Sequence, residues 1–279
     1  MPVRVYRILR IWIFAFLGLA GTPQMTGQTD NATFSAPETT SLGNPASLSE
    51  NTAALFGNPA GLTTNVAPAM TAHHVNYFLL NELTRSAVGG VFPTRSGIFG
   101  VVFHQYGIES FREQKIGLSY ARKFSNVLSG GVQFNYFNVR AKEYGHAGQG
   151  GVEGGLTAKI SSNWRMGLHF FSPVATGSSL RQDHPAFLKF GMAFGLNPKV
   201  DVLVEIEKDL PHPARLHFGS AYRPHKKLTV RVGLQTNPGI FHFGFGSVLW
   251  EYFELNASAS YHPTLGLSPG LGLNYKFKQ

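Results

Sequence analysis

The protein has 279 residues, no cysteine, 32 glycines and 23 phenylalanines, and only 14% of its residues are charged. So low a charged fraction beside so many aromatic side chains argues against a soluble globular domain, and the lack of cysteine excludes disulfides and a lipoprotein-type signal. The formal charge of +9 includes three arginines of the N-terminal segment, so the remainder is modestly basic and no nucleic-acid partner is expected.

The first segment predicts export. Arg4, Arg7 and Arg10 precede an apolar stretch over residues 11–20, and small and polar residues follow it. This order is typical of a secretory signal, and the stretch is too short to span a bilayer comfortably. We predict a signal peptide over residues 1–28. A single amphipathic anchor is the alternative.

A compact insert comes next. Residues 50–62 read ENTAALFGNPAGL, and a shorter echo, GNPAS, stands at 43–47. Ser49 is predicted to cap a short helix over residues 50–56, which the Asn-Pro step ends, and Gly61 permits a tight reversal. We predict that this nearly uncharged piece folds back and closes the lumen of the domain that follows. An ordered periplasmic arm is the alternative.

From about residue 70 to the end, apolar residues recur at every second position. In residues 188–197, Leu188 and Phe190 fall on one face, whereas Lys189 and Gly191 fall on the other. A period of two is the strand period. Such segments number about fourteen, with the weakest near residues 84–92, and an even count is typical of bacterial membrane barrels.

The connections between these segments alternate in length. Longer links at residues 140–151 and 172–186 lie between short turns at 94–97, 124–126, 161–163, 197–199 and 223–227. Outer-membrane barrels show this asymmetry, with the short turns on the periplasmic side. Both ends of the barrel segment are then expected on that side.

Two features favour a membrane barrel over an exported β-sandwich. The polar face is rich in glycine and other small residues while the apolar face carries large ones, as expected for lipid outside and a crowded lumen inside. Aromatic residues also gather near segment ends, as interface girdles require: Tyr77, Tyr106, Tyr120, Tyr136, Trp164, Tyr222, Trp250, Tyr252, Tyr261 and Tyr275. We therefore predict an all-β protein of the bacterial outer membrane: a transmembrane antiparallel up-and-down β-barrel of about 14 strands, with a short N-terminal helical hatch.

Charged residues fall on the inward face of successive strands. Their signs are mixed, which cancels any net field and favours a lumenal network that holds the wall together over a selectivity filter or proton pathway. The predicted members are Lys189, Glu205, Glu207, Arg215, Arg231, Glu254 and Lys276.

No pattern predicts catalysis, a cofactor or a metal site. The adjacent pair His73 and His74 points to opposite faces of one strand and cannot share an ion. His217 and Ser220 are three positions apart and also fall on opposite faces, so they are not a catalytic pair. We predict that the protein is not an enzyme.

The insert resembles the Asn-Pro-Ala signature of the FadL-like outer-membrane family, in particular its PorV/PorQ-type branch from Bacteroidetes. The matching positions are Ala53, Ala54, Asn58, Pro59, Ala60, Gly61 and Leu62. The resemblance implies an N-terminal hatch inside a barrel of about fourteen strands. The long outer loops that form the capture site of classical FadL transporters have no obvious counterpart here.

These observations divide the chain into a signal peptide (1–28), a periplasmic arm with the hatch (29–68) and the barrel (69–279). The resemblance implies a structural or shuttle accessory of a secretion or surface-attachment machine, such as type IX secretion. Its expected partners are outer-membrane lipid or lipopolysaccharide and other outer-membrane or secretion-machine proteins. The alternative is a FadL-like channel for the uptake of hydrophobic small molecules.

Overall fold

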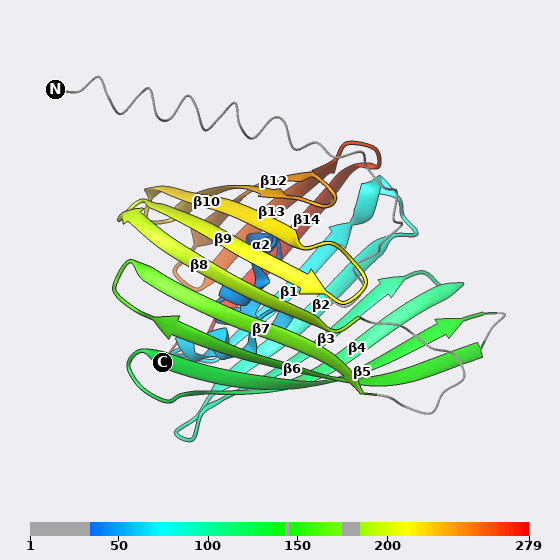
Figure 1. Ribbon diagram of the computed structural model, residues 1–279, viewed down its shortest axis with the longest axis horizontal. Helices are drawn as coiled ribbons and strands as arrows, with labels where there is room; N and C mark the ends of the chain where they lie inside the picture. Colours follow the sequence, from blue (N-terminus) through cyan, green and yellow to red (C-terminus); the bar gives the residue numbers. More distant parts are fainter. Residues whose placement is uncertain (1–33, 143–144, 175–184, 279) are drawn as a thin grey trace.

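The computed structural model describes residues 34–142, 145–174 and 185–278, so the predicted signal peptide lies outside the described residues. The chain forms one closed antiparallel β-barrel of 14 strands around an N-terminal segment (Figure 1). The predicted fold class is confirmed. No helix in the described ranges is long and apolar enough to cross a membrane.

Each strand pairs with its neighbour in sequence, and β1 closes the ring against β14. The strands are β1 (Ala69–Asn76), β2 (Thr84–Pro93), β3 (Ile98–Gly107), β4 (Phe111–Lys123), β5 (Leu128–Ala141), β6 (Gly145–Lys159), β7 (Trp164–Val174), β8 (Phe187–Asn197), β9 (Val200–Asp209), β10 (Arg215–His225), β11 (Leu228–Gln235), β12 (Ile240–Leu249), β13 (Phe253–His262) and β14 (Gly266–Lys276). Because the barrel is closed, every strand is hydrogen-bonded to a neighbour along both of its edges. A sheet surrounded by lipid requires this, since no water can pair with a free edge.

The wall is apolar outside and polar inside. On β8, Leu188 is 51% exposed whereas Lys189 beside it is fully buried. The same alternation continues along the strand, where Gly191 and Ala193 are buried and Phe194 is exposed. Large exposed side chains of this kind occur on all fourteen strands, whereas the described lumen holds charged and amide side chains together with a buried cluster of Phe137, Phe171 and Phe187. The predicted orientation of the two faces is therefore correct.

The two ends of the barrel differ. We call the end where β1 begins and β14 finishes the turn end, because the connections there are short, for example residues 94–97 and 198–199. We call the opposite end the loop end. The predicted long link at residues 140–151 is wrong, because β5 runs to Ala141 and β6 begins at Gly145. Cross-strand pairing continues to Ala141 and Gly145, so backbone hydrogen bonds replace the expected loop.

The predicted aromatic girdles are only partly correct. Trp250 is 78% exposed at the turn end, and Trp164 stacks on Phe194 near the same rim. Tyr106, in contrast, is 5% exposed and faces the lumen. Tyr106 is in phase with the inward Gly100 and His104, so the two-residue repeat places it inward, although its position at a strand end suggested a girdle.

Residues 34–64 lie inside the barrel, and we call this segment the hatch (Figure 1, blue). The hatch is built of short helical turns: α2 (Pro37–Thr40), η2 (Ala46–Leu48), η3 (Asn51–Phe56) and η4 (Pro59–Thr64). A further short turn, η5 (Tyr77–Leu79), follows β1 at the loop end. The helices of the hatch contact different sectors of the wall: η3 meets β1–β3, η4 meets β3–β6, η2 meets β7 and β8, and α2 meets β12–β14.

Candidate functional site

The helix in the predicted hatch motif differs from the expected one. η3 is a 3-10 helix that begins at Asn51, and the residue before it, Glu50, makes no side-chain cap. Ser49 is therefore not the cap that the sequence suggested. Its hydroxyl instead lies 3.3 Å from the Thr39 hydroxyl within the hatch. Tertiary contacts override the local capping preference here.

Asn58 is the polar centre of the Asn-Pro-Ala motif. It precedes η4 and its side-chain oxygen accepts from the Ala60 N–H, while Pro59 takes the first helical position, where its missing N–H costs nothing. Its side-chain amide also donates to the wall, to the carbonyls of Leu156 on β6 (3.0 Å) and Leu168 on β7 (3.1 Å). One buried side chain therefore both starts a hatch helix and fastens it to two strands.

Glycines on the inner wall make room for the hatch. A Cβ atom at any of these positions would come within 3.0 Å of a hatch atom, which real Cβ atoms essentially never do. We call them the glycine belt: Gly89, Gly100, Gly131, Gly155, Gly167, Gly191, Gly219, Gly233 and Gly244. The glycine-rich inward face seen in the sequence is thus the surface against which the hatch packs.

Small residues also allow the hatch to pack against itself. A side chain at Gly61 would overlap the carbonyl of Ser49, so only glycine lets η4 cross that segment. Ala54, Ala60 and Leu62 are fully buried. Every residue of the predicted hatch motif is buried: Ala53, Ala54, Asn58, Pro59, Ala60, Gly61 and Leu62.

Four further polar contacts tie the hatch to the wall. The Asn274 amide donates to Glu38 at 3.1 Å, and Arg165 pairs with Glu50. The Ser47 N–H donates to Glu205 at 2.7 Å, and a ring nitrogen of His217 donates to the carbonyl of Gly43 at 2.6 Å. Burial raises the pKa of Glu38, and its hydrogen bonds and the charge of Arg231 oppose that shift.

One buried charged group, which we call the β6 cluster, consists of Lys115, Asn135, Glu153 and His169. Lys115 and Asn135 donate to one oxygen of Glu153 at 2.7 and 2.8 Å. His169 lies 3.2 Å from the other oxygen. The four residues come from the successive strands β4, β5, β6 and β7. The group therefore connects four neighbouring strands of the wall.

A second group, which we call the β9 cluster, is larger and is defined by Lys189, Glu205, Glu207, Asp209, Arg215 and His217. Glu207 lies at its centre, paired with Lys189 (2.9 Å), Arg215 (2.6 Å) and His217 (3.1 Å). Arg215 also reaches Asp209 at 3.2 Å. Four of the residues predicted for a lumenal network therefore meet here.

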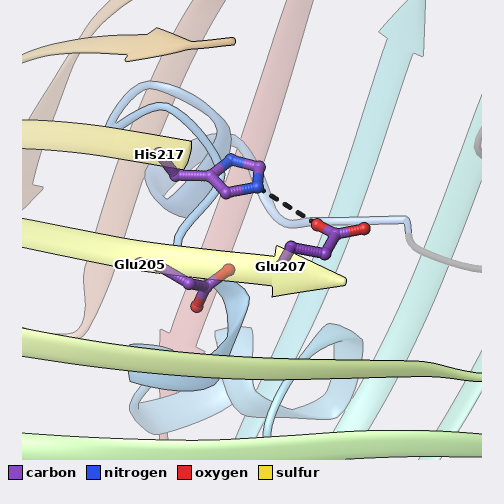
Figure 2. Close-up of side chains that lie close together, drawn as sticks. All are labelled: Glu205, Glu207 and His217. Carbon is purple, nitrogen blue, oxygen red and sulfur yellow. Dashed lines mark hydrogen bonds and ion pairs between the residues drawn. The ribbon is translucent and has the colours of Figure 1, made fainter. Parts of the chain in front are cut away.

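Three members of the β9 cluster have the geometry of metal ligands. One ligand atom each from Glu205, Glu207 and His217 lies within 4.8 Å of the others (Figure 2). The chemistry of the group does not fit a cation, because Lys189 and Arg215 already bind Glu207 and would lie against the ion. Glu205 in turn holds a hatch N–H. The group is better described as an ion-pair network in contact with the hatch.

The remaining predicted charges lie apart from the β9 cluster. Arg231 is 3.9 Å from Glu254 and donates to Asn256 at 2.8 Å. Lys276 is exposed at the turn end of β14. Together with hatch residues, Arg231, Glu254 and Lys276 line a cavity of about 160 Å³. The predicted single network is therefore two separate groups.

The N-terminal end of the hatch lies at the β1–β3 sector, towards the loop end. The Phe34 ring packs edge-on to Phe56, with centroids 5.2 Å apart. The guanidinium of Arg85 lies 5.5 Å from the Phe34 ring and 4.9 Å from the Tyr106 ring. These cation–π contacts bury a charge beside aromatic faces, and they explain why Tyr106 points inward.

A larger cavity opens below the hatch at the turn end. It has a volume of about 1060 Å³ and lies between η4 and the turns that follow β4, β6 and β8. Charged side chains around it include Lys123, Lys159 and the ion pair of Arg223 with Asp201. We call it the turn-end vestibule. Its lining mixes these charged groups with apolar side chains such as Trp164 and Met166, and hatch residues form part of it.

The sequence analysis did not name several of the charged residues that meet in the lumen. Lys115, Glu153 and His169 satisfy the same period-two rule as the predicted charges, so that rule alone would have found them. His217 and Asp209 share a face with Glu205 and Glu207 for the same reason. That these residues contact one another depends on strand register, which the sequence pattern does not give.

No family model matches the sequence, and no curated protein matches it either. Solved structures do resemble it. The Ralstonia pickettii toluene transporter TbuX has a TM-score of 0.68 at 13% identity, over 88% of this chain and 99% of that chain. The Pseudomonas putida toluene transporter TodX has a TM-score of 0.68 at 14% identity, over 89% and 99% of the two chains.

A Pseudomonas aeruginosa FadL homologue is similar too, with a TM-score of 0.60 at 11% identity over 85% of this chain and 96% of that chain. The chain has a FadL-type barrel fold. The predicted FadL-like resemblance is confirmed at the level of fold. The PorV/PorQ-type branch and the match of the insert to the Asn-Pro-Ala signature stay predictions.

Proposed function

We propose that this FadL-type barrel resides in the bacterial outer membrane and lets hydrophobic small molecules cross it, with the hatch as the element that closes the lumen. The observation that carries the proposal is a closed barrel filled by an N-terminal segment, in a fold shared with toluene transporters over most of both chains. The apolar outer wall supports the membrane location. The turn end is then periplasmic.

In this proposal residues 1–28 are the removed signal, residues 29–68 are the arm and hatch, and residues 69–279 are the barrel. The glycine belt and Asn58 position the hatch, and the lumenal charges hold the wall and the hatch in register. We expect a solute to pass only when the hatch shifts, because hatch segments contact strands β1–β8 and β12–β14 across the lumen. The function is transport and involves no catalysis.

Tethering the hatch tests this proposal directly. The chain has no cysteine, so two introduced cysteines are the only thiols. Glu50→Cys with Arg165→Cys replaces an accessible hatch-to-wall ion pair, and a short bis-maleimide then links the two elements. Uptake of a radiolabelled monoaromatic compound into proteoliposomes should stop on linking.

The matched control is Asp201→Cys with Arg223→Cys, which replaces a wall-to-wall ion pair beside the same vestibule. Linking this pair should leave uptake unchanged. If the untethered protein takes up no hydrophobic compound, the transport proposal is wrong. If the tethered hatch transports at the full rate, the hatch is not the closing element.

The second candidate is the accessory of a secretion machine. One observation favours it: several connections at the loop end are short, such as residues 108–110, 236–239 and 263–265, and leave little material for a capture site. Crosslinking in native outer membranes would then recover other secretion proteins, and deleting the protein would impair display of exported cargo. Recovery of the protein alone, with normal cargo display, would rule this candidate out.

A further inference from the structure

The β9 cluster holds one particular turn of the hatch, residues 43–47, which is the first copy of the Gly-Asn-Pro-Ala sequence. The carbonyl of Gly43 accepts a hydrogen bond from His217, and the N–H of Ser47 donates to Glu205. Gly43 has a positive φ of 84°, and a side chain there would come within 3.0 Å of the backbone of β10. The turn is thus pressed against the wall and bound at both ends.

His217 lies between two hydrogen-bond acceptors. Its Nδ1 is 2.6 Å from the carbonyl oxygen of Gly43, and its Nε2 is 3.1 Å from Oε2 of Glu207. A carbonyl oxygen can only accept, so Nδ1 carries a proton. A neutral imidazole has only one N–H. The charge of His217 therefore depends on which group carries the proton between its Nε2 and Glu207: a protonated Glu207 would leave His217 neutral, and a carboxylate requires a second N–H on His217.

Glu207 does not carry this proton. Arg215 donates to its Oε1 at 2.6 Å, and the ammonium of Lys189 lies 2.9 Å from its Oε2. Both partners are cations that can only donate, so they favour the charged carboxylate over a neutral acid that would share its proton with Nε2 of His217. Glu207 is therefore a carboxylate, and Nε2 of His217 carries the second proton.

The charge balance of the cluster agrees. Lys189 from β8 and Arg215 from the strand of His217 supply two positive charges, against three carboxylates from β9: Glu205, Glu207 and Asp209. A protonated His217 supplies the third positive charge, which balances the three negative charges. The site has almost no solvent exposure, and an unbalanced charge there is costly. His212 at the loop end pairs with Asp209, and His242 of β12 is the other ionisable group near His217.

We propose that His217 is an imidazolium and acts as a proton-dependent clasp for the hatch turn at residues 43–47. This regulation rests on the proposed role of the hatch as the closing element. When His217 loses a proton, the remaining proton stays on Nε2 beside the carboxylate of Glu207, which is the stronger acceptor, and the carbonyl of Gly43 loses its donor. The hatch turn is then held less tightly, so alkaline conditions loosen the closure.

The protonation state is tested by ring ¹⁵N NMR of histidine-labelled protein in lipid nanodiscs, with His217→Gln used to assign the signal. We expect both ring nitrogens of His217 in the protonated range at neutral pH. Glu207→Gln keeps the shape of the cluster but removes the charge, and should convert His217 to the neutral Nδ1–H form. A neutral His217 in the unaltered protein at neutral pH would overturn the proposal.

The clasp itself is tested by the leak of a small polar sugar from proteoliposomes as a function of pH, which requires no transport of a hydrophobic compound. The unaltered barrel should leak several-fold more as His217 deprotonates, and His217→Gln should leak at that higher rate at every pH. His169→Gln is the matched control, because His169 also binds a buried carboxylate but makes no hydrogen bond to the hatch.

The control should follow the unaltered protein. A leak that does not change with pH, or a His169→Gln profile identical to that of His217→Gln, would contradict the clasp. Failure of the hydrophobic uptake assay with an intact pH-dependent leak would instead contradict the proposed function alone.

Discussion

The side-chain oxygen of Asn58 occupies the space that a Cβ atom at Gly155 would need. The hatch and the wall therefore interlock at this point, and neither residue can be enlarged independently. Asn58 is fully buried, and its amide bonds reach the backbone of β6, which carries Gly155, and of the neighbouring strand β7. This contact links the Asn-Pro-Ala motif to the glycine-rich wall.

Gly155→Ala is expected to displace the hatch, because the added methyl group overlaps Asn58 and overpacking costs about 1–3 kcal/mol. Limited proteolysis should cut residues 34–64 faster, and the sugar leak should rise. Gly150→Ala on the same strand is the control, since its Cβ would meet only Val174, at 3.5 Å. Equal protection of the hatch in the two variants would show that the interlock has no effect.

Asn58→Ala removes the two N–H donors that three carbonyl oxygens share, and one accepted bond, and each net bond is worth about 0.5–1.5 kcal/mol. We expect a loss of about 2 kcal/mol or more in the free energy of unfolding in urea, measured in lipid vesicles.

Asn58→Asp should be worse than the alanine variant, because a carboxylate oxygen then faces three carbonyl oxygens. Asn65→Ala, which loses one bond within the hatch, is the mild control. An aspartate variant as stable as the unaltered protein would mean that the amide donors are not what holds Asn58.

Lys115→Met should destabilise the barrel by about 3 kcal/mol, because Glu153 keeps a buried charge without its ammonium partner. Adding Glu153→Gln should restore part of that loss, because the buried negative charge is then removed together with its positive partner. Equilibrium unfolding of the two variants measures the difference. Lys199→Met, at an exposed turn, should change stability by less than about 0.5 kcal/mol. If the double variant is less stable than Lys115→Met alone, the loss of stability does not come from an unpaired charge on Glu153.

Leu118→Arg on β4 tests which surface faces lipid. Leu118 is 61% exposed near the middle of its strand, where an arginine costs about 2–4 kcal/mol in a membrane barrel. Leu196→Arg, at a similarly exposed site (68%) at the turn end of β8, should cost about 0–1 kcal/mol. Folding into vesicles measures both. Equal costs at the two sites would contradict a membrane-spanning wall.

The predictions that held were those that depend on local geometry. Alternate side chains of a strand point to opposite faces whatever lies beyond it, so the pattern of Leu188 and Lys189 was sufficient to assign lipid and lumen. The prediction of a loop at residues 140–151 failed because pairing between two strands, and not local composition, decided that segment.

The sequence alone determined that the wall is inverted, with apolar residues outside, and that a compact small-residue segment precedes it. Only the tertiary structure decided that Glu153 meets Lys115 and that His217 meets the carbonyl of Gly43. The physical reason is that facing is set by a two-residue repeat within each strand. Which inward residues share a level depends instead on the register of successive hairpins and on the closure of β1 against β14.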